Sequence, residues 1–440
     1  MRRADAIEHN PSAIVKVACH SLSAVSSLLL VILFFFPAPM AEAQPISHVI
    51  HISVDGLRPD AITALGPANL PNFYRLRAEG AFTDNARTDY DYTETLMNHT
   101  SQLTGRGTLG ATGHNWTNNV DPQAGQTLAS NKGSYVAGVY DVAHDNGLRT
   151  GLYASKSKFS LFDTSWDSVS GTPDLVGPDN GRNKIDVYLY LDDTAVLVNT
   201  MISTMTAQPF HYVFLHLADP DLTGHSSGWT VFPTSSAYCA TIKTMDKRLG
   251  RIFSLIDTNA QWHGRTAIIL TADHGGSGTD HGDSTLPADY TVPFYVWGPG
   301  VMPGADLYLL NPGRRLDPGT NRPAYSAPGQ PIRNGEAANV ALKLLQLGPV
   351  PGSTINAAQD LALTVQPPPD LQLAIVGGEV VLSFSMLTNV FYDIQRTADL
   401  PPGTWSNAAT NLSGTNGSIA QVVVGPPGDP RQFYRLNLRF

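Results

Sequence analysis

Five apolar segments, spread widely between residues 48 and 297, most constrain how this chain can fold. Each is short, nearly continuous in apolar character and rich in β-branched or aromatic residues. Such runs are typical of strands buried on both faces, as in a parallel sheet. The segments are His48–Val54, Thr150–Ala154, Tyr212–Leu217, Thr266–Thr271 and Val292–Trp297.

Helical patterns lie between these segments. The clearest runs from Ser236 to Ile256, where apolar residues recur at helical spacing. An apolar fraction of 42 % is enough to build a real core. Strands that alternate with helices predict an α/β/α sandwich around a mostly parallel central sheet.

The composition changes from about Gly348 onward. "PPPD" at residues 367–370 indicates a stiff linker, and short alternating runs separated by turn residues follow it. This spacing predicts a small C-terminal all-β sandwich. We expect a catalytic domain over 44–361, a Pro-rich linker over 362–370 and a β-sandwich module over 371–440. The module contains no His and no Cys, which favours a binding, export or attachment role over a second active site.

The N-terminus has the features of a secretory signal peptide. Basic residues, among them Arg2 and Lys16, precede an apolar run at 28–36, and a small-x-small pattern ends at Ala43. We expect residues 1–43 to be removed and the protein to be exported, as a periplasmic, secreted or cell-surface protein. A retained membrane anchor is the alternative. The mature chain contains no other run long enough to span a bilayer.

Charge and cysteine content narrow the class further. The formal net charge of −9 argues against a nucleic-acid partner. Cys19 lies in the predicted signal peptide, so Cys239 would remain alone and form no internal disulfide. Its place in a helical pattern predicts a small, buried apolar residue. The sequence gives no indication of oligomeric state.

Acids and histidines gather where the predicted strands end. In parallel α/β sheets, ligands bind beyond these carboxyl ends. Each motif alone has a plain explanation as a turn-forming or hydrogen-bonded loop. Together the motifs make a mixed carboxylate and imidazole set that suits zinc or a similar divalent ion. The set is Asp55, Asp221, His225, Asp273, His274 and His281.

Six such ligands are too many for one tetrahedral catalytic zinc, but they suit two metals that share a substrate. Two metals can clamp the attacking and leaving oxygens of a phosphoryl transfer. The glycines within "DHGGSGTDHG" at 273–282 would let the chain return so that His281 can bind.

A hydroxyl nucleophile is also predicted. Thr95 lies just before a plausible helix start in "TETLMNHTSQLTG", and a helix N-terminus stabilises phosphate. The alternative is that Thr95 only caps the helix. Thr93, Thr100 and Ser101 are competing hydroxyls.

Four motifs in order resemble the alkaline phosphatase superfamily, in particular its type I phosphodiesterase/nucleotide pyrophosphatase branch. They are "VDGLRPD", "TLMNHTSQLTG", "DPDLTGH" and "DHG" followed by "HG", within roughly 46–361. Any one of these motifs is weak, whereas the combination is specific. The Cys/Ser-x-Pro-x-Arg nucleophile motif of the arylsulfatase branch is missing.

The resemblance implies a role for each matching residue. One zinc would be held by Asp55, Thr95, Asp273 and His274. The other zinc would be held by Asp221, His225 and His281. Thr95 would attack phosphorus and form a phospho-threonine intermediate that water later hydrolyses.

Three features depart from the family. An Asn that steadies the phosphate usually follows a His-Gly pair, which is absent here; Asn115 is our choice, with Asn118 and His114 as rivals. Lys156 and Lys158 resemble the Lys-x-Lys of phosphonoacetate hydrolases and would bind substrate, or else they are solvated loop lysines. His281 follows Asp-His closely, whereas the last histidine is distant in many nucleotide pyrophosphatases, which puts nucleotide specificity in doubt.

We therefore expect an exported two-zinc hydrolase that cleaves phosphodiester or nucleotide pyrophosphate bonds of a small phosphorylated substrate. The alternative within the same fold is a phosphonoacetate hydrolase or phosphomonoesterase. A non-catalytic binding protein is the alternative from another class.

Overall fold

The computed structural model describes residues 14–17, 45–174, 181–364, 371–386, 391–398, 404–414, 418–426 and 432–439. The chain divides into two compact units. One unit is Ala43–Thr364, and the other combines Met1–Glu42 with Val365–Phe440.

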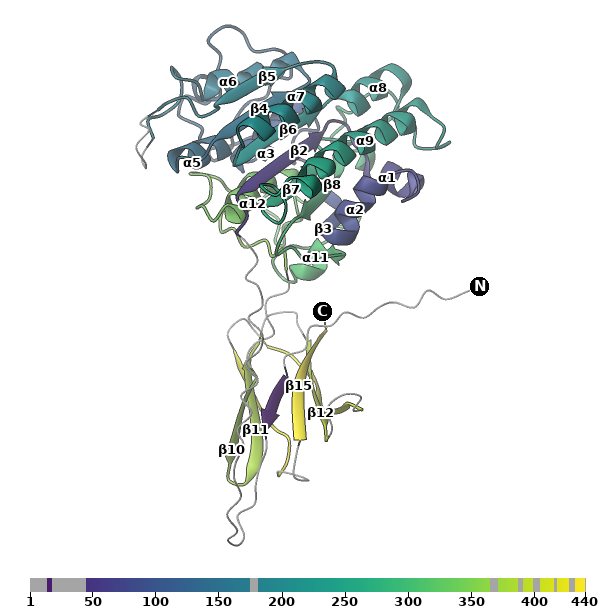
Figure 1. Ribbon diagram of the computed structural model, residues 1–440, viewed down its shortest axis with the longest axis vertical. Coiled ribbons are helices and arrows are strands. Elements are labelled where there is room, and N and C mark those ends of the chain that lie inside the picture. Colours follow the sequence, from purple (N-terminus) through teal and green to yellow (C-terminus); the bar gives the residue numbers. More distant parts are fainter. Residues whose placement is uncertain are drawn as a thin grey trace. The chain divides into compact units, whose positions relative to one another are not determined.

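The larger unit is built on an eight-stranded sheet with the order β5-β4-β6-β2-β7-β8-β3-β9 (Figure 1). Its central strands β4, β6, β2 and β7 run parallel, while β8 is antiparallel to both β7 and β3. The strands are β2 (His48–Val54), β3 (Ala81–Arg87), β4 (Thr150–Ala154), β5 (Val187–Tyr190), β6 (Tyr212–Leu217), β7 (Thr266–Thr271), β8 (Thr291–Trp297) and β9 (Ala305–Asp306).

Five of these strands, β2, β4, β6, β7 and β8, match the predicted segments. β2, β6 and β7 are buried at every residue, as expected for strands with helices on both faces. β3, β5 and β9 were not predicted, because β3 carries Asp and Asn, β5 is partly exposed, and β9 has only two residues. The predicted α/β/α sandwich with a mostly parallel sheet is confirmed.

The helices that cover the sheet form two groups, and the members of each group pack against one another. One group packs around α9 and includes α1, α2, α7 and α8; the other joins α3, α5 and α12. The helices are α1 (Pro59–Leu65), α2 (Pro71–Glu79), α3 (Thr95–Thr104), α4 (Leu128–Lys132), α5 (Val139–Asp145), α6 (Ser160–Ser165), α7 (Thr194–Ala207), α8 (Asp219–Ser227), α9 (Ala237–Thr258), α10 (Pro287–Tyr290), α11 (Leu307–Leu310) and α12 (Ala337–Leu344), with 3-10 turns η1 (Ser157–Phe159) and η2 (Asn334–Glu336).

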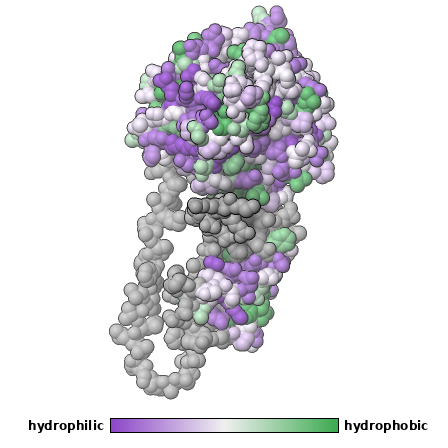
Figure 2. Space-filling model, turned by 90° about the vertical axis from the view of Figure 1, so that its right-hand side faces the viewer, coloured by the Kyte–Doolittle hydropathy of each residue, from purple (hydrophilic) through white to green (hydrophobic). Residues whose placement is uncertain are grey.

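The long amphipathic helix α9 confirms the helical pattern seen in the sequence. Ser236 caps it, because its side chain accepts a hydrogen bond from the Cys239 backbone N–H. Cys239 itself is a free, buried cysteine, as predicted. On the face of this unit shown in Figure 2, hydrophobic residues are scattered among hydrophilic ones.

The C-terminal strands form two antiparallel sheets. One has the order β10-β11-β14 and the other β1-β15-β12-β13, and residues from both sheets share one small core. The strands are β1 (Ile14–Val17), β10 (Gln372–Val376), β11 (Glu379–Ser385), β12 (Phe391–Thr397), β13 (Ser406–Leu412), β14 (Ile419–Val423) and β15 (Gln432–Arg439). The predicted all-β module is confirmed as part of the fold.

Two parts of the predicted organisation lie mainly outside the described residues. Within the predicted signal peptide, only 14–17 are described, and they pair with β15. Residues 365–370 of the predicted linker are also outside the described ranges, whereas Leu363 packs in the core of the larger unit. Signal cleavage and the linker remain predictions.

The separate cores generate a test of the domain boundary. The core of the larger unit ends at Leu363 and that of the smaller unit begins at Leu371, so they share no residue. We expect a chain of residues 44–366 to fold with a cooperative thermal transition and to retain turnover. Circular dichroism and steady-state kinetics check this. A truncated chain that folds but is inactive would show that the β module contributes to the site.

Candidate metal centre and nucleophile

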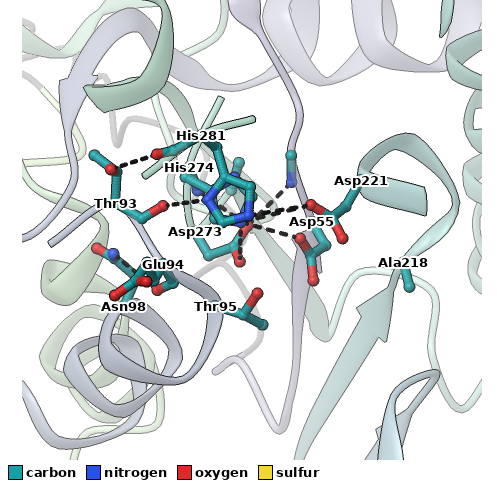
Figure 3. A network of polar contacts seen from close by, with 12 residues as sticks. Asp55, Thr93, Glu94, Thr95, Asn98, Ala218, Asp221, Asp273, His274 and His281 are labelled. Atoms are coloured by element: carbon teal, nitrogen blue, oxygen red, sulfur yellow. Dashed lines mark hydrogen bonds and ion pairs between the residues drawn. The ribbon is translucent and has the colours of Figure 1, made fainter. Parts of the chain in front are cut away.

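Three neighbouring strands deliver acidic side chains to one edge of the sheet. β6, β2 and β7 lie side by side and run parallel, so their carboxyl ends meet at the same edge. Asp55 directly follows β2, Asp221 lies in the first turn of α8 after β6, and Asp273 comes shortly after β7. All three are buried. Figure 3 shows them converging on the stacked rings of His274 and His281.

The ligand atoms fall into two overlapping clusters. Asp55, Asp273 and His274 form the first, with His274 Nε2 3.3 Å from Asp55 Oδ1 and 3.2 Å from Asp273 Oδ2. Asp221 and His281 form the second together with His274. His225 lies at its edge, with Nε2 3.4 Å from Asp221 Oδ1 and a side chain that is 45 % exposed. All six predicted ligands therefore gather in one place, although His225 sits outside the tightest grouping.

Four buried side-chain atoms in this cluster have no hydrogen-bond partner among the described residues. They are Asp55 Oδ1, Asp221 Oδ1, Asp273 Oδ2 and His274 Nε2, each buried and without a hydrogen bond in the described structure. Buried polar groups are nearly always satisfied, so four unpaired atoms facing one another require an explanation. Three are carboxylate oxygens and one is an imidazole nitrogen, the donor set that a divalent cation such as zinc accepts. The residues present fit the implied metals.

The histidines are already oriented for ligation. In each, Nδ1 lies within hydrogen-bond distance of a backbone carbonyl: Gly275 for His274 (2.8 Å), Thr93 for His281 (2.7 Å) and Thr279 for His225 (3.0 Å). A carbonyl can only accept, so Nδ1 carries the proton and Nε2 presents its lone pair to the cluster. Backbone carbonyls commonly fix metal-binding histidines in this way.

The charge state of the cluster agrees with cation binding. Burial raises the pKa of Asp273 well above its usual range, and the nearby Asp55 and Asp221 raise it further. Burial lowers the pKa of His274 to about 3, so its ring is neutral near pH 7 and able to bind metal. For Asp55, burial opposes ionisation, but Lys156 and His216 hold its pKa well below the usual range. The buried carboxylates thus depend on nearby positive charge.

Lys156 is one of the positive groups that meet this need. Its Nζ lies 2.6 Å from Asp55 Oδ2 and 2.6 Å from Asp221 Oδ2, so it joins one carboxylate from each cluster. It also lies 3.5 Å from the Thr95 hydroxyl. Burial tends to lower the pKa of Lys156, but the two carboxylates raise it above its ordinary value. Lys156, whose side chain is 13 % exposed, is therefore part of the site and not a solvated loop lysine.

Thr95 begins helix α3 beside this cluster but does not cap it. The N-cap is Glu94, which makes no side-chain capping bond, and Thr95 occupies the first helical position. The hydroxyls of Thr93 and Thr100 are bonded to backbone carbonyls, those of His281 and Leu96 respectively. Thr95 is thus the hydroxyl that faces the acidic cluster (Figure 3).

The choice of Asn115 stays a prediction, and the structure offers Asn119 as a further candidate. Asn115 is bound through its backbone to Thr108 and Asn131. Asn119 instead lies at the start of α3, where its Oδ1 accepts a hydrogen bond from the Leu96 backbone N–H at 3.1 Å.

Neither rival to Asn115 occupies this position either. His114 is buried against Ser101, and the Asn118 side chain accepts from the Val120 backbone. Lys158 binds Asn119 through both its carbonyl oxygen (2.7 Å) and Oδ1 (3.2 Å). The contacts of Lys158 therefore support Asn119 and do not reach the carboxylates.

Sequence reasoning also missed two buried histidines behind the ligands. His216 in β6 lies 2.8 Å from Asp55 Oδ2, and its other nitrogen is 3.1 Å from the Ser155 hydroxyl. His99 in α3 contacts the Thr95 carbonyl at 2.8 Å and the Ser53 hydroxyl at 2.9 Å. A histidine inside a buried strand, as in "YVFLHL", was the available signal for His216.

The glycines after His274 are required by close packing. A Cβ at Gly275 would collide with the Ala288 carbonyl oxygen, and a Cβ at Gly276 would collide with the Trp229 ring. The chain can therefore turn back beneath Trp229 and bring His281 to the cluster only if these positions lack side chains.

The metal centre can be tested with Asp273→Asn. In the natural protein, Asp273 Oδ1 accepts a hydrogen bond from the Gly56 backbone N–H at 3.1 Å. Asparagine keeps the size of the side chain and an oxygen that can accept this bond, but it removes the negative charge. We expect at least one bound zinc to be lost, measured by atomic absorption on the purified protein. Asp246→Asn is the matched control, because Asp246 is a buried acid whose carboxylate accepts hydrogen bonds from the backbone N–H groups of Asn72 and Phe73 and from the Asn72 side chain. Full zinc content in Asp273→Asn would exclude Asp273 as a ligand.

Membrane character was assessed on the described helices. None of them combines the length and the apolar character needed to cross a bilayer.

Known proteins resemble the chain in two different ways. Curated relatives match locally: GPI ethanolamine phosphate transferase 1 of Gibberella zeae is 36 % identical over 110 residues, 24 % of this chain and 10 % of the relative. The mouse protein of the same name is 33 % identical over 88 residues, 20 % of this chain and 9 % of the relative. The matched segment thus spans about a tenth of the length of these relatives.

Among solved structures, murine ectonucleotide pyrophosphatase / phosphodiesterase 5, an inactive variant in complex with AMP, is 16 % identical with a TM-score of 0.48. The match covers 72 % of this chain and 99 % of that one. The family description "Type I phosphodiesterase / nucleotide pyrophosphatase" matches residues 49–294, more than half of the chain. The matched range contains the ends of β2, β6 and β7 and all six candidate ligands. The chain therefore belongs to the type I phosphodiesterase / nucleotide pyrophosphatase family.

Proposed function

We propose that this protein is a two-zinc hydrolase of phosphate ester bonds that uses Thr95 as its nucleophile. The observation that carries the proposal is the set of four unpaired, buried ligand atoms beside the first residue of α3. A purely structural cluster of this kind would leave three buried carboxylates without sufficient compensation.

Two zinc ions suit the donor set. Asp55, Asp273, His274 and the Thr95 hydroxyl would hold one ion, and Asp221, His225 and His281 would hold the other. When bound, the metals would supply Lewis-acid chemistry, neutralising phosphate oxygens and favouring ionisation of a hydroxyl.

Residues of the chain would orient the phosphate. The N-terminus of the ten-residue helix α3 favours an anion next to Thr95. Asn119 uses its Oδ1 to accept from Leu96 N–H and Lys158, while its Nδ2 makes no hydrogen bond within the described residues. Nδ2 is thus available to donate to a phosphate oxygen. Attack by the Thr95 oxygen on phosphorus would break the P–O bond to the leaving alcohol or phosphate, which would leave with the proton that the hydroxyl loses or with one from water, and would give a phospho-threonine. Water would then attack the same phosphorus and break its bond to the Thr95 oxygen, which regains a proton, releasing the phosphorylated product.

The substrate class follows from family and charge. We propose a phosphodiester or nucleotide pyrophosphate as the substrate. Lys156 lies 3.5 Å from the Thr95 hydroxyl and would bind a negatively charged group of the substrate next to the scissile bond. Because an ammonium favours a substrate with additional negative charge, Lys156 also supports a test of the alternative substrates, a phosphomonoester or a phosphonate. The local similarity to ethanolamine phosphate transferases favours a second candidate, in which an alcohol replaces water as the final acceptor.

We also propose that the protein is exported. The support is the basic, apolar and small-x-small order of residues 1–43. N-terminal sequencing of the protein from its natural source should then begin at Gln44.

Thr95→Ala tests the nucleophile. Because the six carboxylate and imidazole ligands remain, the variant should still bind zinc while kcat falls by about three orders of magnitude. Thr95→Ser should retain much more activity, since a hydroxyl remains. Thr100→Ala is the matched control, because its buried hydroxyl bonds only to the Leu96 carbonyl. Normal turnover in Thr95→Ala would rule out the covalent mechanism.

Lys156→Met tests the charge preference of the site. If the ammonium binds a substrate anion, its loss should raise KM for a p-nitrophenyl phosphomonoester, a dianion, about tenfold more than for the diester, a monoanion; that difference is about 1.4 kcal/mol. Zinc content measured on the same sample separates a substrate effect from a metal effect. Equal changes for both substrates would contradict a direct contact between Lys156 and substrate charge.

A further inference from the structure

Two buried asparagines lie behind the nucleophile and the first carboxylate cluster. Asn98 belongs to α3 and Asn334 begins η2, and neither side chain is accessible to solvent. They share a hydrogen bond, with Asn334 Nδ2 donating to Asn98 Oδ1 at 3.1 Å. Residues 236 apart in sequence are thus joined by one amide pair. Because burying an amide costs free energy unless it is bonded, the remaining contacts show what this pair holds in place.

Asn98 binds the segment that leads into the nucleophile. Its Oδ1 accepts from the Asp89 backbone N–H at 2.7 Å. Its Nδ2 donates to the carbonyls of Tyr92 (2.9 Å) and Glu94 (3.1 Å), and Glu94 immediately precedes Thr95. All four hydrogen-bonding positions of the amide are therefore used, and three of them fix the backbone of residues 89–94. The contact with Glu94 is drawn in Figure 3.

Asn334 binds the backbone of a candidate ligand. Besides Asn98, its Nδ2 lies 3.2 Å from the Ala272 carbonyl and 3.2 Å from the Asp273 carbonyl. Asp273 contributes its carboxylate to the first cluster. The amide pair therefore connects the backbone before Thr95 directly to the backbone of Asp273.

The same segment also orients a ligand of the second cluster. Thr93 donates its hydroxyl to the His281 carbonyl at 2.5 Å, and its own carbonyl accepts from His281 Nδ1 at 2.7 Å. Figure 3 shows this reciprocal pair on the side of the site opposite Asp221. A shift of residues 89–94 would move Thr95 and His281 together, relative to Asp273.

We propose that Asn98 and Asn334 form a positioning pair that sets the place of the Thr95 hydroxyl relative to the Asp273 carboxylate. The inference rests on the proposed role of Thr95. Neither asparagine touches the ligand atoms or the hydroxyl, so both act through the backbone. A displacement of about 1 Å at reacting atoms can lower a rate by about 100-fold, which makes such a device consequential.

The test compares Asn334→Ala with Asn339→Ala. Asn339 is an equally buried asparagine in α12 whose amide binds Ser353, Ile355 and Val350, away from the ligands. Both changes should lower the thermal midpoint. Only Asn334→Ala should also lower kcat, by about 10- to 100-fold with little change in KM. Asn98→Ala should act in the same way, and the double variant should lose less than the product of the single losses, because the two residues share one bond.

The outcomes separate this inference from the proposed function. Should Asn334→Ala not fold, Asn334→Asp keeps the volume but removes the donors and must lose kcat at least as strongly. Unchanged kcat in the folded variant, or an equal kcat loss in Asn339→Ala, would overturn the positioning role. Thr95→Ala is measured in the same series: if it is inactive while Asn334→Ala is fully active, only the positioning role fails. If Thr95→Ala is fully active, the proposed nucleophile fails.

Discussion

Three carboxylates buried at one sheet edge are the constraint on which the rest of the site depends. Asp55, Asp221 and Asp273 converge because β2, β6 and β7 are adjacent and parallel. Carboxylates this close and this deeply buried oppose one another's ionisation unless positive charge lies between them. Lys156 provides one charge, yet an oxygen of each acid remains unpaired. This arrangement of the strands supports the proposal that further cations bind here.

The surrounding residues hold the three acids and the histidines beside them in position. Backbone carbonyls fix the histidine rings so that Nε2 faces the acids, and His216 holds the second oxygen of Asp55. Glycines at 275 and 276 allow the return of the chain that carries His281. The nucleophile segment is tied to the same cluster through Thr93 and Asn98. The candidate ligands, the proposed nucleophile and their supporting hydrogen bonds thus form one connected network.

Local signals explain what the sequence could predict. Strands such as β2 and β7 are fully buried and mostly apolar, and the acids that follow them mark strand ends. Together with the expectation of a parallel sheet, these two features group the six candidate ligands. By contrast, β3 carries the polar residues Thr83, Asp84 and Asn85 in its middle. Because Asp and Asn are uncommon in strands, the sequence of β3 gives little indication that it forms one.

Long-range contacts explain what the sequence could not predict. Asn115 and Asn119 lie in one loop, and only the folded path of that loop shows which amide reaches α3. Lysine is usually a surface residue. Lys156 instead lies in the site, because its ammonium binds carboxylates that follow two different strands. Asn334 lies outside every motif and matters only because η2 packs on α3. Such roles depend on tertiary neighbours that no local pattern encodes.

Anomalous diffraction at the zinc edge, from crystals of the protein grown with zinc, tests the central claim most directly. Two peaks should appear, one among Asp55, Asp273 and His274 and the other between Asp221 and His281, with the Lys156 ammonium displaced from at least one carboxylate. A cluster without an anomalous peak, with Lys156 still bonded to both Asp55 and Asp221, would contradict the assignment of this site as a two-metal centre.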